Sequence, residues 1–367
     1  MIGSKSLILL MVLPAVATFG TARAAVGIAP TARDALAQSD DWWRGDAGRK
    51  LANNALSWQN ANGGWWKNYD TNKPRPAREV AARTDDGPAG DSEDVWHKVS
   101  TYDNGATYCE MRILARAARV LGDQKYRDAF NRGLKYLFES QYPNGGWPQR
   151  FPLQNNYGRH ITYNDQAMIG VMELLDDVAQ GAPDFTFVSE ADRKRAAEAF
   201  DRGVDCILKC QIKANGKLTA WCEQHDEVTF APANARAYEL ASISGDESAG
   251  ITMLLMRVKN PNQQIRDAID AAVAWYDSTK IPGKRYDKVI DASGKATDRV
   301  LRDDPNGVVW ARFYEIDTNK PFFCNRDGVK VDSLDKVSAE RRAGYAWYGD
   351  WGKPLPKAYA EWKERNP

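Results

Sequence analysis

Histidine is scarce in this chain, and neither sign of charge is in excess. The 367 residues include 3 His, and 50 Lys+Arg are balanced by 49 Asp+Glu, which leaves a formal net charge of +1. Because there is no basic excess to neutralise phosphates, the composition excludes nucleic-acid binding by overall attraction. An anionic ligand would therefore have to be held by a local cluster of Arg and Lys.

The familiar catalytic motifs are missing as well. The sequence has no Walker loop, no G-x-G-x-x-G, no H-E-x-x-H and no G-x-S-x-G. With His97, His160 and His225 as the only histidines, nothing specifies a Ser-His-Asp site. The cluster His225-Asp226-Glu227 is more typical of structural hydrogen bonding than of catalysis.

Five cysteines are too few for a dense disulfide framework. Cys206 and Cys210 lie four apart on a predicted helix, where their Cβ atoms are too distant for a bridge. Cys210 and Cys222 flank a turn and could pair, and buried free thiols are an equal alternative. No Cys/His spacing suggests zinc.

The N-terminus has the pattern of a secretory signal peptide. Lys5 precedes an apolar run over residues 7–17, and Ala22-Arg23-Ala24 has the form of a cleavage site. The run is too short to span a bilayer, and no other segment resembles a membrane span. We predict a signal peptide over residues 1–24 and a periplasmic or secreted protein. Cleavage would remove Lys5 and Arg23 and change the formal charge from +1 to −1.

Helical periodicity dominates the remaining residues, 25–367. Apolar residues recur every three or four positions after Tyr108, after Tyr126, after Ser189 and after Asn260-Pro261. Ser189 opens a Ser-Glu-Ala-Asp segment that resembles a capping box. Further helices are expected over residues 42–59 and after Asn164. Polar stretches over residues 69–100 and 283–306 are expected to be surface loops. The pattern predicts one mainly helical domain with long loops and little β structure.

The loops between these helices repeat. Gln59 leads into Asn62-Gly63-Gly64-Trp65, and Gln141 leads into Asn144-Gly145-Gly146-Trp147. A weaker third copy is Gln211 followed by Asn215-Gly216. Each interval has room for two helices and a loop, which is the pattern of antiparallel helix pairs closed into an (α/α) barrel or toroid. Such a fold carries its functional residues on the loops at one end.

Two pairs of acidic and amide residues stand where helices begin. Asp103-Asn104 precedes one helix and Asn164-Asp165 precedes another. Each pair alone is explained by helix capping. Both pairs could also converge on a hard cation such as Ca²⁺, if their loops are neighbours.

Three arginines lie in apolar or aromatic surroundings: Arg236 beside Tyr238, Arg312 between Trp310 and Phe313, and Arg326 in Asn325-Arg326-Asp327. Such arginines commonly form structural ion pairs. Together with a cation site, they would instead suit a substrate that carries carboxylates.

At these residues the sequence resembles the pectate lyases of polysaccharide lyase family 10, from about Trp42 to near the C-terminus. Besides the two Asn-Gly-Gly-Trp turns, the resemblance rests on Cys206-Ile207-Leu208-Lys209-Cys210-Gln211 and on five further segments. These are Asp103-Asn104-Gly105-Ala106-Thr107, His160-Ile161-Thr162-Tyr163-Asn164-Asp165, Trp221-Cys222-Glu223-Gln224-His225-Asp226, Pro232-Ala233-Asn234-Ala235-Arg236-Ala237-Tyr238-Glu239 and Trp310-Ala311-Arg312-Phe313-Tyr314-Glu315. Trp66 and Tyr102 depart from the family pattern, in which Pro and Ile are expected.

The resemblance implies an (α/α) barrel that cleaves polygalacturonate, as a monomer, by Ca²⁺-assisted anti-β-elimination. Carried over position by position, it implies Asp103, Asn104 and Asp165 as Ca²⁺ ligands. Asp103 is also implied in catalysis and Asn104 in substrate binding. Arg236 would remove the C5 proton, and Arg312 and Arg326 would bind uronate carboxylates. Because a guanidinium normally stays protonated, the base role rests on the resemblance alone.

Two other functions remain open at this point. One is an inverting glycoside hydrolase that uses Asp103 and Asp165 as acid and base. The other is a non-catalytic pectin-binding protein that uses Trp65 and Trp147. No nucleic acid or membrane is expected as a partner.

Overall fold

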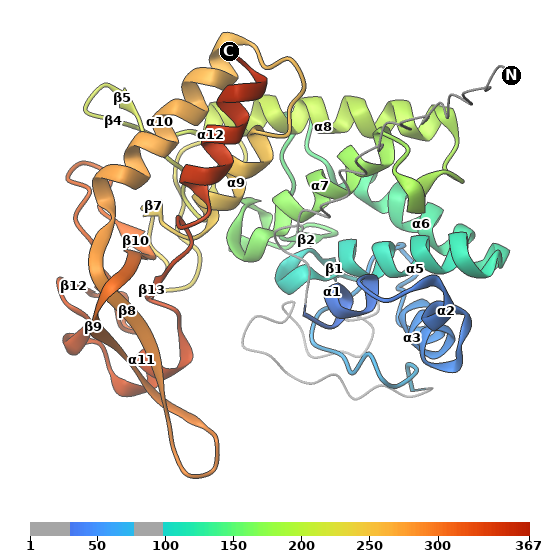
Figure 1. Cartoon of the computed structure of the whole chain (residues 1–367), viewed down its shortest axis with the longest axis horizontal. Coiled ribbons are helices and arrows are strands. Elements are labelled where there is room, and N and C mark those ends of the chain that lie inside the picture. The colour runs from blue at the N-terminus through green and yellow to red at the C-terminus, as the bar shows by residue number, and fades with distance from the viewer. Residues whose placement is uncertain (1–29, 77–97) are drawn as a thin grey trace, which may run out of the picture.

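The computed structural model describes residues 30–76 and 98–367, and helices dominate this part of the chain (Figure 1). The predicted signal peptide and His97 lie outside the described residues. The helices are α1 (Pro30–Leu36), α2 (Asp40–Arg44), α3 (Asp46–Ser57), α5 (Tyr108–Leu121), α6 (Gln124–Ser140), α7 (Ala167–Ala179), α8 (Glu190–Cys210), α9 (Glu247–Leu255), α10 (Gln263–Thr279), α11 (Ala339–Gly344) and α12 (Leu355–Arg365).

The strands are short, apart from one hairpin, and they connect the helical units. They are β1 (Ser100–Thr101), β2 (Arg150–Phe151), β3 (Ile161–Thr162), β4 (Lys213–Ala214), β5 (Lys217–Leu218), β6 (Gln224–His225), β7 (Ile243–Ser244), β8 (Ile281–Ile290), β9 (Ala296–Ala311), β10 (Phe313–Tyr314), β11 (Phe323–Cys324), β12 (Lys330–Val331) and β13 (Tyr348–Gly349). Antiparallel ladders join β1 to β2, β3 to β6 and β7 to β10.

The helices form two layers. Nearly every residue from Ala167 to Leu175 in α7 is buried, and α5 and α9 are buried almost as completely. The helices α6, α8 and α10 bury one stripe and expose the other. Since a helix that is buried on all sides must be surrounded by others, α5, α7 and α9 form the inner layer and α6, α8 and α10 the outer one. This is the predicted mainly helical toroid of antiparallel pairs.

The predicted helix starts are largely confirmed. The Ser189 side chain accepts a hydrogen bond from the Asp192 backbone at 3.1 Å, as the capping-box pattern predicted. The expected helix over residues 42–59 is wrong in one respect, because Gly45 breaks it into α2 and α3. A Cβ on Gly48 would lie 2.4 Å from Cα of Trp43, so the two short helices pack too closely for any side chain there.

The three repeated glutamines tie each helical unit to the next. The side-chain Nε2 of Gln59, Gln141 and Gln211 each donates to a carbonyl in its own turn and to a helix carbonyl of the following unit, at 2.8–3.0 Å. The acceptors in the following units are Ala129, Ala199 and Ala268. The weak third copy in the sequence is therefore a full third unit.

The tryptophans of these turns are structural. The indole N–H groups of Trp65 and Trp147 donate to helix carbonyls at 2.7 and 2.9 Å, and both side chains are fully buried, at 0% exposure. In the third unit Trp221 makes the same bond, at 2.8 Å. Because neither Trp65 nor Trp147 reaches the surface, the pectin-binding role considered for them is wrong.

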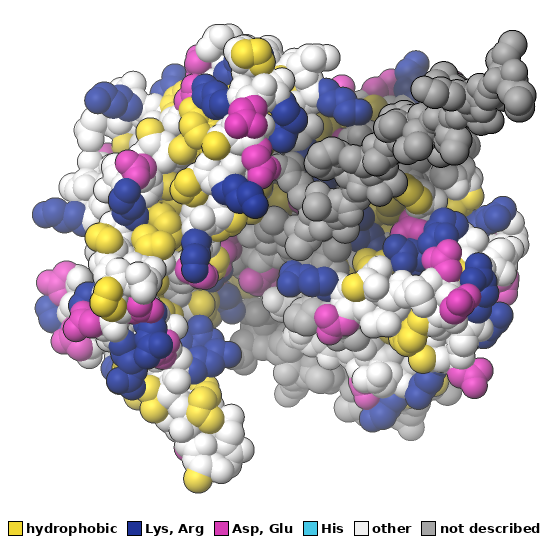
Figure 2. Space-filling view, viewed as in Figure 1, with side chains coloured by type: hydrophobic (Ala, Val, Ile, Leu, Met, Phe, Trp, Pro, Cys, Tyr) yellow, Lys and Arg dark blue, Asp and Glu magenta, His cyan; other side chains and the backbone are white. Residues whose placement is uncertain are grey.

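The polar stretch over residues 283–306 is a hairpin rather than an irregular loop. Strands β8 and β9 project from the body as an arm (Figure 1). Asp291 organises the turn, since its Oδ1 accepts hydrogen bonds from the backbone of Ser293 and Lys295. Cross-strand pairs such as Lys284 with Asp303, at 2.5 Å, neutralise much of its charge. Figure 2 shows Lys and Arg interspersed with Asp and Glu over the face of the molecule that it draws.

All five cysteines are buried free thiols. The possible Cys210–Cys222 disulfide is therefore not formed. Among the described residues, no helix is both long and apolar enough to cross a membrane.

Candidate active site

Two loops of the repeat present their polar residues at corresponding positions. Strand β1 leads into a 3₁₀ turn at Asp103–Gly105, and β3 leads into a 3₁₀ turn at Asn164–Gln166. Asn104 and Asp165 occupy the same place in these turns, both left-handed, with φ of 54° and 51°. Asn and Asp tolerate this conformation better than other non-glycine residues do. The two turns pack against each other, which brings their polar residues close together.

The carboxyls of Asp103 and Asp165 lie within hydrogen-bonding reach of each other. Lys67 forms a buried ion pair with Asp103. Burial alone would raise the pKa of Asp103, but the Lys67 ammonium outweighs it and holds that pKa below its usual range. Burial, followed by the negative charge of Asp103, raises the pKa of Asp165 well above its usual range. Two carboxylates this close repel unless a proton or a cation lies between them.

The donor set fits a hard divalent cation. Oδ1 of Asp103 is buried and has no hydrogen-bond donor, and Asp103 is 3% exposed. Asp103 and Asn104 line a cavity of about 180 Å³ together with Lys67, Gln149 and Arg236. Carboxylate and amide oxygens are the ligands that Ca²⁺ prefers. The three residues predicted as Ca²⁺ ligands thus come from adjacent turns, as the prediction requires.

A second group of possible metal ligands lies outside this cavity: His160, Asp226 and Glu227. Glu227 is already paired with Arg159 at 2.5 Å and with His160 at 3.0 Å. Oδ1 of Asp226 accepts two backbone hydrogen bonds and one from a hydroxyl. Both carboxylates of this group have protein partners, whereas Oδ1 of Asp103 is buried without one, so this group fits a cation less well than Asp103 and Asp165 do.

His225 has the structural role that the sequence favoured. Its side chain is fully buried, its Nδ1 bonds the carbonyl of Phe230 at 2.8 Å, and its Nε2 accepts from the backbone N–H of Cys222 at 3.0 Å. Burial lowers the pKa of His225 to about 4. The imidazole is therefore neutral and holds the loop after β6 in place.

Arg312 is enclosed by carboxylates. Its guanidinium donates to Glu223 at 2.6 Å, to Asp246 at 2.8 Å and to Glu247 at 2.9 Å, with a longer contact of 3.4 Å to Asn164. The residue is 6% exposed. These bonds engage four of its five N–H donors. Arg312 thus has one N–H left for the expected binding of a substrate carboxylate. Its other donors hold Asn164 and the acidic residues in place.

Arg236 lines the cavity and is held by Glu239. The guanidinium Nε donates to Glu239 at 2.8 Å, and a second nitrogen binds the other carboxylate oxygen. Burial tends to lower the pKa of Arg236, but the Glu239 carboxylate outweighs it and the pKa lies above the ordinary range. In this arrangement Arg236 is a cation.

Two tyrosines gather the arginines on one side of the site. Tyr238 and Tyr345 pack edge to face, with ring centroids 5.3 Å apart. The guanidiniums of Arg236 and Arg341 lie 5.0 and 4.7 Å from the Tyr238 ring, and Arg326 lies 5.9 Å from it. Arg326 has a 56% exposed side chain, pairs with Glu340 at 3.0 Å and lies beside the cavity rather than in its lining. We name this group of arginines and tyrosines, with Arg312 over Tyr345 at 4.9 Å, the arginine wall.

Sequence reasoning missed several residues of the site. They are Lys67, Gln149, Glu223, Asp246, Glu247 and Arg341. Lys67 follows the first Asn-Gly-Gly-Trp turn, and Gln149 follows the second at the same offset, two residues after the Trp. Their position after a repeated turn was the signal that could have identified them. The acidic residues around Arg312 had no local signal, because their partner lies 65 to 89 positions away.

Comparison with known proteins gives a consistent result. A family model described as pectic acid lyase matches residues 59–355. A family 10 polysaccharide lyase from Cellvibrio cellulosa is 36% identical over 90% of this chain and 96% of its own, with a TM-score of 0.76. A mutant of that lyase in complex with trigalacturonic acid matches with the same identity and coverage and a TM-score of 0.75. A search of curated proteins finds no match.

Proposed function

The chain belongs to the pectic acid lyase family and is a polysaccharide lyase, and from this premise we propose that it cleaves polygalacturonate by Ca²⁺-assisted anti-β-elimination. The products would be oligogalacturonides with a 4,5-unsaturated end. We also propose that residues 1–24 direct export, because the substrate is an extracellular polymer.

One observation carries this proposal: Asp103 lines the cavity with Lys67 and Arg236, its buried Oδ1 has no hydrogen-bond donor, and the carboxyl of Asp165 lies against it. A uronate carboxylate cannot approach two bare carboxylates, but it can share a divalent cation with them. Asp103, Asn104 and Asp165 would hold the ion. Bound there, Ca²⁺ would neutralise the uronate carboxylate and stabilise negative charge that develops next to it.

The elimination itself requires a base and a leaving group. The base takes the proton from C5, the C–H electron pair forms the C4=C5 double bond, and the C4 oxygen leaves with the departing chain. We propose Arg236 as the base, since it is the basic residue of the arginine wall that lines the cavity. Glu239 favours its protonated form, so the role requires that a bound substrate weaken this ion pair or that the pH be high.

Arg312 and Arg326 would orient the polymer. Arg326 is exposed and sits over Tyr238, where its guanidinium can exchange Glu340 for a substrate carboxylate. Arg312 contributes one N–H and keeps Asn164 next to the calcium ligands. Burial raises the pKa of two carboxyls that bind Arg312, those of Glu223 and Asp246; the pKa of Asp246 is about 7, because of burial and then of Glu247.

The geometry disfavours the hydrolase alternative. An inverting hydrolase needs its two carboxyls about 6.5–9.5 Å apart, so that a water fits between one of them and the sugar. Asp103 and Asp165 are within hydrogen-bonding reach of each other, which leaves no such space.

The test is incubation of the purified protein with polygalacturonate, with and without excess EDTA. We expect an ultraviolet-absorbing unsaturated product with Ca²⁺ present, no product with EDTA, and recovery when Ca²⁺ is added back. Full turnover in EDTA would contradict the metal assignment. Saturated reducing ends in the absence of an ultraviolet signal would instead identify a hydrolase.

A further inference from the structure

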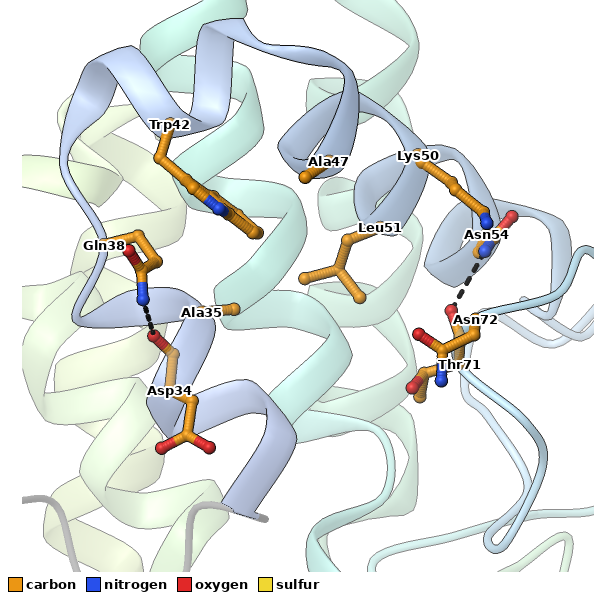
Figure 3. Close-up of a pocket in the computed structure, with 10 residues that line it drawn as sticks. All are labelled: Asp34, Ala35, Gln38, Trp42, Ala47, Lys50, Leu51, Asn54, Thr71 and Asn72. Atoms are coloured by element: carbon orange, nitrogen blue, oxygen red, sulfur yellow. Dashed lines mark hydrogen bonds between the residues drawn. The ribbon is translucent and has the colours of Figure 1, made fainter.

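A pocket of about 440 Å³ lies on the N-terminal helices, apart from the catalytic cavity. Figure 3 shows the indole of Trp42, from α2, pointing into it above the small apolar side chains of Ala35 and Leu51. The ring is fixed in place, because it packs edge to face on the buried Trp43 with centroids 5.4 Å apart. We name this site the Trp42 pocket.

Polar groups without protein partners surround the indole ring. Within the described residues, the indole N–H of Trp42, the Asp34 carboxylate and the Lys50 ammonium form no hydrogen bond or ion pair with the protein. Asn54 is 5% exposed and is oriented by a 3.0 Å bond from its Nδ2 to the carbonyl of Thr71. Its Oδ1 accepts no hydrogen bond in this part of the chain. The pocket therefore offers both donors and acceptors, and Asn54 holds one of the acceptors in a fixed position.

This lining matches the chemistry of a sugar ring. One face of a pyranose or furanose presents C–H groups, which pack on the electron-rich face of an indole. Its hydroxyls both donate and accept, and so suit an amide, a carboxylate and an ammonium at the rim. One carboxylate and one ammonium leave the pocket without a net charge, and it contains no arginine. We propose that the Trp42 pocket binds an uncharged saccharide unit.

The pocket also lies close to the catalytic centre. A cavity of about 250 Å³ shares Thr71 with the Trp42 pocket and shares Lys67, Asn68 and Asn104 with the catalytic cavity. A neutral branch on a polymer bound at the catalytic cavity can therefore extend along the segment over residues 67–72. Binding at both places raises the effective concentration of the branched polymer at the catalytic site. The identity of the polymer rests on the proposed function, whereas the saccharide binding itself does not.

Affinity electrophoresis in native gels tests the proposal with polymers that a uronate lyase cannot cleave. The probes are galactan and arabinan, with polygalacturonate in a parallel gel. We expect one of the neutral polymers to retard the wild-type protein, and Trp42→Ala to weaken that binding at least about tenfold because the stacking face is lost. Trp58→Phe is the matched control. Trp58 is also a half-buried tryptophan of the N-terminal segment, but it donates to the carbonyl of Lys73 and does not line the pocket.

A second variant keeps the test valid if Trp42→Ala does not fold. Ala47 is exposed on α3 and lines the pocket, so Ala47→Arg would fill it without removing a contact. We expect the same loss of retardation, while Ala37→Arg, exposed and outside the pocket, retains binding. Wild-type mobility unchanged by both neutral polymers would overturn the proposal. The proposal would also be overturned if only polygalacturonate retarded the protein and this retardation were lost in Trp42→Ala. Lyase activity on unbranched polygalacturonate should be unchanged in all four variants, which separates this proposal from the proposed function.

Discussion

The two sides of the active site are built in different ways. The carboxylate side, with Asp103, Asn104 and Asp165, is made by corresponding turns of a repeat. The arginine wall comes from the irregular chain after the repeat, where Tyr238 and Tyr345 collect guanidiniums from segments about a hundred residues apart. Repeated backbone geometry positions the first group, and aromatic packing positions the second. The carboxylate side should therefore be rigid without a ligand, whereas the arginine wall depends on its compensating acids.

The largest effect is expected from the carboxylate side. Asp165→Ala should lower kcat/KM by at least about a thousandfold, because both the cation and the substrate carboxylate lose their binding partner. The melting temperature without Ca²⁺ should not fall, since the substitution removes a buried repulsion. Calcium titration by calorimetry and steady-state kinetics measure the two effects. Asp226→Asn is the control. A loss of calcium binding in that variant would assign the metal to the second group of possible ligands, His160, Asp226 and Glu227.

The arginine wall is tested next by Arg236→Lys. If Arg236 is the base, kcat should fall at least about a hundredfold with the fold intact, because the compact ammonium cannot occupy the guanidinium position. If Arg236 only binds a carboxylate, KM should rise and kcat should be largely preserved. If its pair with Glu239 is purely structural, the melting temperature should fall instead. Near wild-type kcat in a stable variant would eliminate the base role.

A smaller effect is expected at the exposed edge of the wall. Arg326→Ala should raise KM a few-fold with little change in kcat, because the residue is exposed and screened by solvent. The wild type should prefer demethylated over highly esterified pectin, and the variant should show a reduced preference, since esterification removes the charge that Arg326 binds. Rates on the two polymers for both proteins give the comparison. An unchanged preference would place the specificity with the cation instead.

The smallest expected effect is a dependence of the melting temperature on pH. Asp246, Glu110 and Glu173 each have a folded-state pKa of about 7, raised mainly by burial, and that of Asp165 is also raised. A carboxyl with a raised pKa binds its proton more tightly when folded, so its contribution to stability is present at low pH and is lost as the pH rises through about 7. The melting temperature without Ca²⁺ should therefore fall by several degrees between about pH 5 and pH 8. Calcium should reduce this fall, and a rise over that interval would contradict the assignment.

The sequence predicted most of the scaffold because the scaffold is local and periodic. The capping box at Ser189 and the Gln59 and Gln141 turns are short patterns with direct structural consequences. Residues 283–306 were expected to be a loop, because alternation along β8 and β9 is masked by charges that pair across the hairpin. The glycines at positions 45 and 48 were the local signal for the break between α2 and α3, and the apolar period over residues 42–59 concealed it.

The site was only partly predictable for the same reason. Asp103 and Asp165 stand at helix starts, where capping and metal binding have the same appearance in a sequence. The family resemblance favoured metal binding over helix capping, and the close approach of the two carboxyls supports that interpretation. The enclosure of Arg312 by Glu223 and Glu247 depends on long-range packing, so a carboxylate-binding arginine and a buried ion-paired one could not be told apart.

The glutamine ties have a consequence for how this fold can vary in length. Each tie fixes the distance between a turn and the helix of the following unit, over 70, 58 and 57 residues. An insertion within one of the paired helices would move the helix carbonyl away from the glutamine side-chain amide that binds it. The turn that carries the glutamine would then be displaced, together with the neighbouring active-site loop. Length can therefore change in the projecting hairpin and in the loops of a unit, as the difference between the first two spans shows (70 − 58 = 12 residues), whereas each acceptor helix must keep its register with its turn. Each helical unit therefore acts as a module of fixed geometry, and the position of the proposed metal ligands depends on it.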